Sequence, residues 1–222
     1  MIDAIKGLIL DMDGVLWRGS EPIGNLSAIF SRFRARGWRI TLATNNATRT
    51  ISQYVDRLGA FGVVVEPWQI VNSAIAAAAF LREQFPKGGP VYLIGEDGLI
   101  EALNQQGFYQ SEQDGIAVIS SMDRKVNYDK LRKATLLIRG GALFVATNPD
   151  RTFPAPEGLI PGAGAILAAL EAATYVKPVI TGKPSPAMYH IALSRLGLSP
   201  SETLVVGDRA ETDIAGAQAI GC

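Results

Sequence analysis

Short apolar runs that alternate with helical patterns are the feature that most constrains the fold of this chain. Strands of a parallel sheet are buried on both faces and read as continuous apolar runs, whereas covering helices repeat their apolar residues with a period of 3.6. The sequence predicts strands at 4–10, 38–44, 61–65, 90–95, 115–120, 142–148 and 203–208. Because helical patterns separate them, we expect an α/β fold with a doubly wound, Rossmann-like parallel sheet.

The helical patterns are regular. Apolar residues at 26, 29, 30 and 33 follow helical spacing, and Gly37 stands where a helix is capped at its C-terminus. Ile51 and Val71 begin two further patterns. The remaining predicted helices cover about 97–106, 127–139, 162–173 and 186–196.

Composition narrows the class of partner. Lys plus Arg and Asp plus Glu number 21 each without a long single-sign block, so the sequence shows no electrostatic footprint for nucleic acid or anionic lipid. A secretory pattern and a membrane-length apolar run are both missing, and we expect a cytoplasmic protein that binds a small molecule. Cys222 is the single cysteine, which excludes an internal disulfide and a zinc cluster built on thiolates.

Two carboxylates, Asp11 and Asp13, end the first apolar run in "GLILDMDGVLW". Alternation along an extended chain puts both on one side at the carboxyl end of the strand, where open α/β sheets place their ligands. An EF-hand calcium loop does not fit, because Leu16 and Pro22 occupy its glycine and glutamate positions. A metal or catalytic site remains, beside the plainer interpretation of an Asx-type turn.

A second acidic group follows the last predicted strand, where Asp208 and Asp213 stand in "VVGDRAETD". Carboxylates from two strands at one end of a sheet repel one another unless a hard cation such as Mg2+ lies between them. This convergence predicts a metal site. For Asp213 alone, an acid in the first turn of a helix is an equally good explanation.

Two further segments offer groups that bind phosphate oxygens. Thr44, Asn45 and Asn46 follow the second strand with a hydroxyl, two amides and turn backbone, although alone they would be turn chemistry. Lys183 precedes Ser185 and Pro186, which are typical of a helix start and suit an anion there. No structural role explains the four segments together, so we expect them to form one site.

Two weaker patterns also occur in the sequence. "LATNNATRT" and "VATNPDRT" both end a strand in Ala-Thr-Asn, which turn chemistry after strands explains more simply for the second copy. "GAGAIL" at 162–167 lacks the third glycine of a dinucleotide-binding loop and does not follow a predicted strand.

In these four segments the chain resembles the haloacid dehalogenase (HAD) superfamily of phosphatases. Its four motifs read "DMDGV" (11–15), "TNN" (44–46), "GKPSP" (182–186) and "GDRAETD" (207–213) in the family's order. Far more residues separate Thr44 from Lys183 than one crossover connection needs, which predicts an inserted module. That module looks like the α/β cap of the NagD and 4-nitrophenylphosphatase branch, subfamily IIA. The predicted division is 1–86 for the first part of the core, 87–177 for the cap and 178–222 for the second part.

The resemblance implies a chemistry. Asp11 would attack the phosphorus to form an aspartyl-phosphate, and Asp13 would exchange protons with the leaving oxygen and water. Asp11, the Asp13 carbonyl and Asp208 would hold Mg2+, with Asp213 behind these ligands. Lys183 would bind phosphate oxygens with the "TNN" residues, Thr44, Asn45 and Asn46.

The resemblance also sets expectations about partners and about the end of the chain. The cap would select a small phosphorylated metabolite, and Asn148 and Asp150 are its candidate specificity residues. Two copies of the chain are expected to pair through the cap. Relatives continue beyond the fourth motif, which implies that this chain is truncated and that "TLVV" (203–206) forms an apolar sheet edge.

Two other functions remain open. The first is a phosphate-binding protein of the same fold that is catalytically weak or silent. The second is a phospho-acceptor signalling module, which also gathers acids, a threonine and a lysine around Mg2+ but is shorter and has no cap. The physiological substrate stays undetermined among nucleotides, sugar phosphates and similar metabolites.

Overall fold

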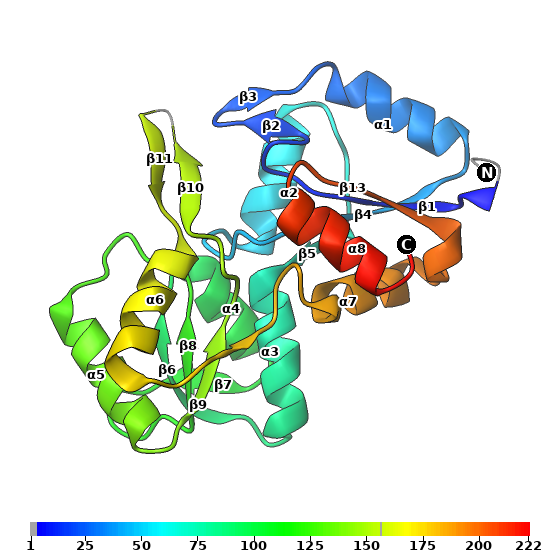
Figure 1. Cartoon of the computed structure of the whole chain (residues 1–222). Coiled ribbons are helices and arrows are strands. Elements are labelled where there is room, and N and C mark those ends of the chain that lie inside the picture. Colours follow the sequence, from blue (N-terminus) through cyan, green and yellow to red (C-terminus); the bar gives the residue numbers. More distant parts are fainter. Residues whose placement is uncertain (1–3, 156) are drawn as a thin grey trace. The chain divides into compact units, whose positions relative to one another are not determined.

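The computed structural model describes residues 4–155 and 157–222 and divides the chain into two compact units (Figure 1). Unit 1 comprises Met1–Thr44, Ile51–Asn72 and Lys183–Cys222. Unit 2 comprises Asn45–Thr50 and Ser73–Gly182. Each unit has its own parallel sheet, and the predicted α/β class is confirmed.

Unit 2 begins earlier than the predicted cap. Helix α3 (Ser73–Gln84) lies in unit 2, because Ala74, Ala77 and Leu81 pack into the apolar cluster of that unit's sheet. The short segment Asn45–Thr50 joins it. Which residues act as a cap stays a prediction.

The sheet of unit 1 is parallel, with strand order β13-β1-β4-β5. Its strands are β1 (Gly7–Leu10), β4 (Arg39–Thr44), β5 (Ile70–Asn72) and β13 (Thr203–Val206). The registers that pair Leu10 with Val206 and with Leu42 align their carboxyl ends. At the edge of the described sheet, Leu204 and Val206 in β13 are 47% and 37% exposed.

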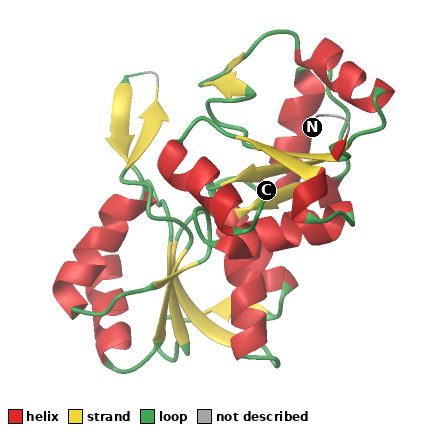
Figure 2. Cartoon of the chain, turned by 45° about the vertical axis from the view of Figure 1, so that its right-hand side comes forward, coloured by secondary structure: helices red, strands yellow, loops and turns green. Residues whose placement is uncertain are grey.

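Helices cover both faces of this sheet (Figure 2). They are α1 (Leu26–Ala35), α2 (Ile51–Ala60), α7 (Pro186–Leu196) and α8 (Ala215–Ala219), with short helices η2 (Pro67–Gln69), η3 (Pro200–Glu202) and the π-helix η4 (Ala210–Ile214). Leu8, Leu10 and Leu42 form the core with Phe30 of α1 and Leu58 of α2. A small hairpin, β2 (Trp17–Arg18) and β3 (Glu21–Pro22), follows β1.

The strand predicted at 61–65 is wrong, and β5 takes its place in the sheet. Phe61 and Gly62 instead close α2, since their N–H groups donate to Leu58 and Gly59 and Gly62 has a φ of 74°. The valines after them form an apolar run because Val63 and Val65 fill the core without strand pairing. Burial alone therefore produced the strand-like pattern.

The sheet of unit 2 is also parallel, with order β12-β9-β8-β6-β7. Its strands are β6 (Gly89–Ile94), β7 (Phe108–Gln110), β8 (Ala117–Ser120), β9 (Leu143–Ala146) and β12 (Val179–Ile180). Alternate residues build two cores: Leu93 and Ile119 pack with α3 and α4 (Asp97–Gln105), whereas Tyr92 and Val118 pack with α5 (Tyr128–Arg139) and α6 (Ala163–Thr174).

The sequence prediction missed the shortest elements of unit 2. These are β7, β12 and the antiparallel hairpin of β10 (Thr152–Ala155) and β11 (Gly158–Pro161), drawn in yellow-green in Figure 1. Strands of two to four residues carry too few apolar positions to show a period. Across the described ranges 4–155 and 157–222, the helices are too short or too polar to cross a membrane.

Candidate functional site

Strand ends bring the predicted residues of unit 1 together. Asp11 directly follows β1, Thr44 is the last residue of β4, and Asp208 follows β13 after one glycine. The backbone N–H of Asp11 donates to the Val206 carbonyl at 2.8 Å and ties the first and last of these ends together. Parallel pairing therefore places the acids where the sequence predicted a ligand site.

Lys183 links two of these carboxylates. Its ammonium donates to Asp11 Oδ1 and to Asp213 Oδ1 at 2.5 Å each, and to the Ala43 carbonyl at 3.0 Å. Lys183 is only 3% exposed and stands three residues before α7. All three donor positions of the ammonium are thus directed at acceptors, which fixes the side chain.

Burial has the largest effect on the pKa of Asp11. It raises the pKa of Asp11 to about 7, even though the charge of Lys183 lowers it, and the nearby charge of Asp213 adds to the rise. Burial alone favours the neutral amine of Lys183, but the charges of Asp11 and Asp213 outweigh it and hold its pKa above the ordinary value. The lysine therefore stays charged, and Asp11 is the group whose protonation responds to its surroundings.

The acids fit a hard divalent cation. Asp11, Asp208 and Asp213 each offer one carboxylate oxygen, and these oxygens lie within 4.8 Å of one another. An all-oxygen donor set of this kind suits Mg2+ or Ca2+. Gly14 leaves room for the carboxylate of Asp208. A Cβ at position 14 would stand 2.0 Å from Asp208 Oδ2, and the φ of 91° at this position favours glycine.

Asp213 does more than begin a helix. It lies 2% exposed in η4, and its second oxygen accepts the backbone N–H of Arg209 at 3.1 Å. The hydroxyl of the buried Tyr189 in α7 donates to the Asp213 carbonyl at 2.9 Å. Asp213 thus belongs to the acidic cluster and also accepts a hydrogen bond from Lys183.

Trp17 and Thr44 approach the carboxyl group of Asp13 in unit 1. The indole N–H of Trp17 donates to Asp13 Oδ1 at 2.8 Å, and the Thr44 hydroxyl lies 3.4 Å from Oδ2. Trp17 was not among the predicted site residues. Its only signal was a side chain able to donate one hydrogen bond, placed four residues after an acid inside an apolar run.

The amides predicted beside Thr44 lie in unit 2. Asn46 Oδ1 accepts the N–H and the hydroxyl of Thr48, which is the turn chemistry that the sequence left open. The Asn45 carbonyl accepts the amide of Asn148 at 2.7 Å, and the Asn45 amide donates to Asp150 at 3.1 Å. Asn148 and Asp150 therefore hold the segment 45–50 within unit 2.

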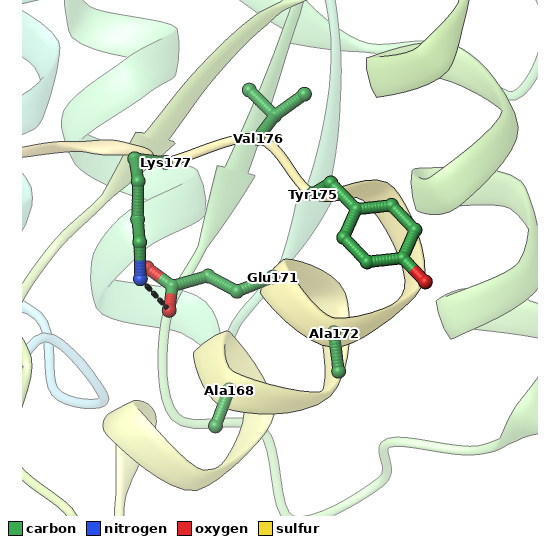
Figure 3. Close-up of a pocket in the computed structure, with 6 residues that line it drawn as sticks. All are labelled: Ala168, Glu171, Ala172, Tyr175, Val176 and Lys177. Carbon is green, nitrogen blue, oxygen red and sulfur yellow. Dashed lines mark hydrogen bonds and ion pairs between the residues drawn. The ribbon is translucent and has the colours of Figure 1, made fainter.

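A shallow hollow on unit 2 lies apart from these residues in the chain (Figure 3). Ala168, Glu171, Ala172, Tyr175, Val176 and Lys177 line it, at the end of α6 and just beyond. The ion pair of Lys177 and Glu171, at 2.8 Å, stands at its side. The predicted site residues are not among the lining residues.

Two family models match the chain at the segments that carry the site. The model described as haloacid dehalogenase-like hydrolase matches residues 8–109, and a second model of HAD-hydrolase-like proteins matches residues 180–222. Between them they include every predicted site residue of unit 1.

Relatives named for phosphatase activities match nearly the whole chain. The acid sugar phosphatase of Staphylococcus aureus is 36% identical over 217 residues, which are 97% of this chain and 83% of that protein. The p-nitrophenyl phosphatase of Archaeoglobus fulgidus is 35% identical with a TM-score of 0.92, covering 98% of this chain and 84% of that one. The glycerol phosphate phosphatase of Mycobacterium tuberculosis, solved in complex with calcium, is 34% identical with a TM-score of 0.91 and covers 99% and 65%.

Proposed function

The chain belongs to the haloacid dehalogenase-like hydrolases, in the subfamily IIA of 4-nitrophenylphosphatases and acid sugar phosphatases, and we propose that it dephosphorylates small sugar phosphates through Asp11. It is a phosphoric monoester hydrolase. We propose the reaction mechanism, the identity of the cation and the class of substrate.

Asp11 is the proposed nucleophile. One of its carboxylate oxygens forms a bond to phosphorus while the bond from phosphorus to the sugar oxygen breaks, which gives an aspartyl-phosphate. The ammonium of Lys183, at 2.5 Å, fixes the orientation of this carboxylate. Water then attacks the phosphorus and returns Asp11 to its starting state.

Asp13 is the proposed acid and base. Its carboxyl group gives a proton to the departing sugar oxygen and later takes one from the attacking water, so that protons balance over the cycle. Asp13 follows Asp11 by two residues just beyond the end of β1, and its Oδ2 lies 3.4 Å from the Thr44 hydroxyl at the end of β4.

The proposed ligands of Mg2+ are the side-chain oxygens of Asp11 and Asp208 and the backbone carbonyl of Asp13. Asp213 is proposed to lie next to these ligands without binding the cation directly. When bound, the cation supplies the positive charge that lets an anionic phosphate approach an anionic carboxylate. Lys183 and Thr44, with Asn45 and Asn46, are the proposed phosphate-binding groups.

The observation that carries this proposal is the Lys183 ammonium bonded to two buried carboxylates beside a third. Burying such a set is costly, and catalysis explains why a chain retains it.

We also propose that the cap, predicted at 87–177, mediates pairing of two copies, which sedimentation would reveal as a dimer.

The test measures phosphate release from glycerol phosphate and 4-nitrophenyl phosphate with Mg2+. Asp11→Asn should abolish turnover, whereas Asp129→Asn, at a side chain 78% exposed in unit 2, should leave it unchanged. An Asp11→Asn protein as active as the wild type would overturn the assignment. Binding of the esters without release by the wild type would favour the silent phosphate-binding protein.

A further inference from the structure

Trp17 makes a buried contact with the proposed acid. Its side chain is 1% exposed, and its indole N–H donates to Asp13 Oδ1 at 2.8 Å. An indole has one donor and no acceptor, so this bond uses all of its hydrogen-bonding capacity. Packing alone would be served equally well by phenylalanine.

The indole ring is fixed from several sides. The Arg57 guanidinium lies 4.2 Å from the ring centroid and donates to the Gly19 carbonyl of the β2–β3 hairpin. The Phe61 ring packs at 6.1 Å from it. Backbone bonds from Gly14 N–H to the Trp17 carbonyl, at 2.8 Å, close the turn that joins Trp17 to Asp13. The donor is therefore held in one place before any substrate arrives.

We propose that Trp17 is a positioning residue that fixes the carboxyl group of Asp13 so that Oδ2 delivers the proton to the leaving oxygen. This inference rests on the proposed function. Because the indole N–H occupies Oδ1, the proton of the acid stands on Oδ2, the oxygen beside Thr44. In the step, the bond from phosphorus to the leaving oxygen breaks, that oxygen takes the proton from Oδ2, and Asp13 is left as a carboxylate that Trp17 still holds.

The leaving group decides how much this positioning matters. A sugar or glycerol oxygen departs as a poor alkoxide and needs the proton, whereas 4-nitrophenolate is a stable anion and departs with little help. A defect in proton delivery therefore lowers the rate for alkyl phosphates selectively. A general loss of fold or of metal lowers both rates alike.

The experiment compares kcat/KM for glycerol phosphate and for 4-nitrophenyl phosphate at saturating Mg2+. Trp17→Phe keeps an aromatic ring and removes the donor, and Trp38→Phe is the matched control, since that ring also lies under an arginine, Arg36. For Trp17→Phe we expect kcat/KM to fall roughly tenfold or more on glycerol phosphate, the scale of one hydrogen bond to a charged group, and far less on 4-nitrophenyl phosphate. The loss should appear in kcat and leave KM nearly constant.

A second variant covers the case in which Trp17→Phe does not fold. Benzothienylalanine placed at position 17 keeps the shape of the indole and replaces the N–H by sulfur, and it should give the same selective loss. Indole N–H resonances of the wild type and of Asp13→Ala add a readout without turnover: of the three tryptophans, Trp17 alone should shift upfield.

Each outcome decides the inference. Equal losses on both substrates, no loss on either, or an indole resonance that ignores Asp13→Ala overturns the role of Trp17. A wild-type protein that releases phosphate from neither ester refutes the proposed function instead, so the two failures are distinguishable.

Discussion

Replacing Lys183 by methionine should lower the stability of unit 1 by more than the loss of an exposed ion pair would. Lys183 is 3% exposed, and its ammonium bonds to two carboxylates, Asp11 and Asp213, which are also buried. Removing one partner of a buried ion pair costs about 3–5 kcal/mol, because the remaining charge is left without compensation. For a chain of this size that corresponds to a melting temperature lower by roughly 10 °C.

The matched control is Lys177→Met. Lys177 is 84% exposed and pairs with Glu171 at 2.8 Å, so the substitution and the type of partner are the same while burial differs. Exposed pairs contribute less than about 1 kcal/mol. Thermal unfolding in chelator, which keeps metal binding out of the comparison, measures both variants.

The cost should also depend on pH. Burial raises the pKa of Asp11 to about 7, and Lys183 works against that rise. Without the lysine the pKa of Asp11 is higher still, so the folded variant binds a proton where the folded wild type does not. Stability falls with pH wherever the folded state binds more protons than the unfolded state. Below about pH 7 both folded proteins keep the Asp11 proton, so the loss should grow only as the pH rises above about 7.

A double variant separates charge from packing. Adding Asp213→Asn to Lys183→Met removes one of the two unpaired charges and should recover part of the lost stability. Equal destabilisation by the two lysine variants, or a cost that shrinks as pH rises, would refute the account of a charge-compensated buried cluster.

Three more predictions follow from single contacts. Gly14→Ala should weaken Mg2+ binding by roughly tenfold or more in calorimetry, because its Cβ would stand 2.0 Å from Asp208 Oδ2; unchanged affinity would remove Asp208 from the site. Asp208→Asn should leave unfolding in chelator within about 0.5 kcal/mol of the wild type, since the side chain is exposed, and should abolish the added stability that Mg2+ gives. Asn148→Ala should cost about 1–3 kcal/mol in denaturant unfolding by leaving the Asn45 carbonyl with one bond fewer, and a cost below about 0.5 kcal/mol would contradict that bond.

Elements with their own start and stop signals were predictable. Helix α7 occupies 186–196 as expected, because Ser185 and Pro186 begin it and Gly197, with a φ of 63°, ends it. The strand predicted at 61–65 failed because the apolar run reports burial, and a core residue is apolar whether or not it pairs. Local sequence therefore located helix ends better than strand pairing.

The site also contains residues that could be predicted from the sequence and contacts that could not. Asp11, Thr44 and Asp208 follow from strand ends, since parallel pairing gathers such residues without further information. The bond from Trp17 to Asp13 is local but was hidden, because a tryptophan in an apolar run is explained by packing. The contacts of Asn45 with Asn148 and Asp150 join residues about a hundred positions apart, and one sequence alone does not reveal such pairs.

The most direct test of the central claim traps the phosphorylated enzyme. Wild-type protein is quenched with acid during turnover of glycerol phosphate, treated with borohydride, which reduces an acyl phosphate to an alcohol, and digested for mass spectrometry. If Asp11 is the nucleophile, we expect homoserine in its place, and no such change in protein quenched without substrate. Reduction at another aspartate, or unmodified Asp11 in enzyme that is releasing phosphate, would contradict that assignment.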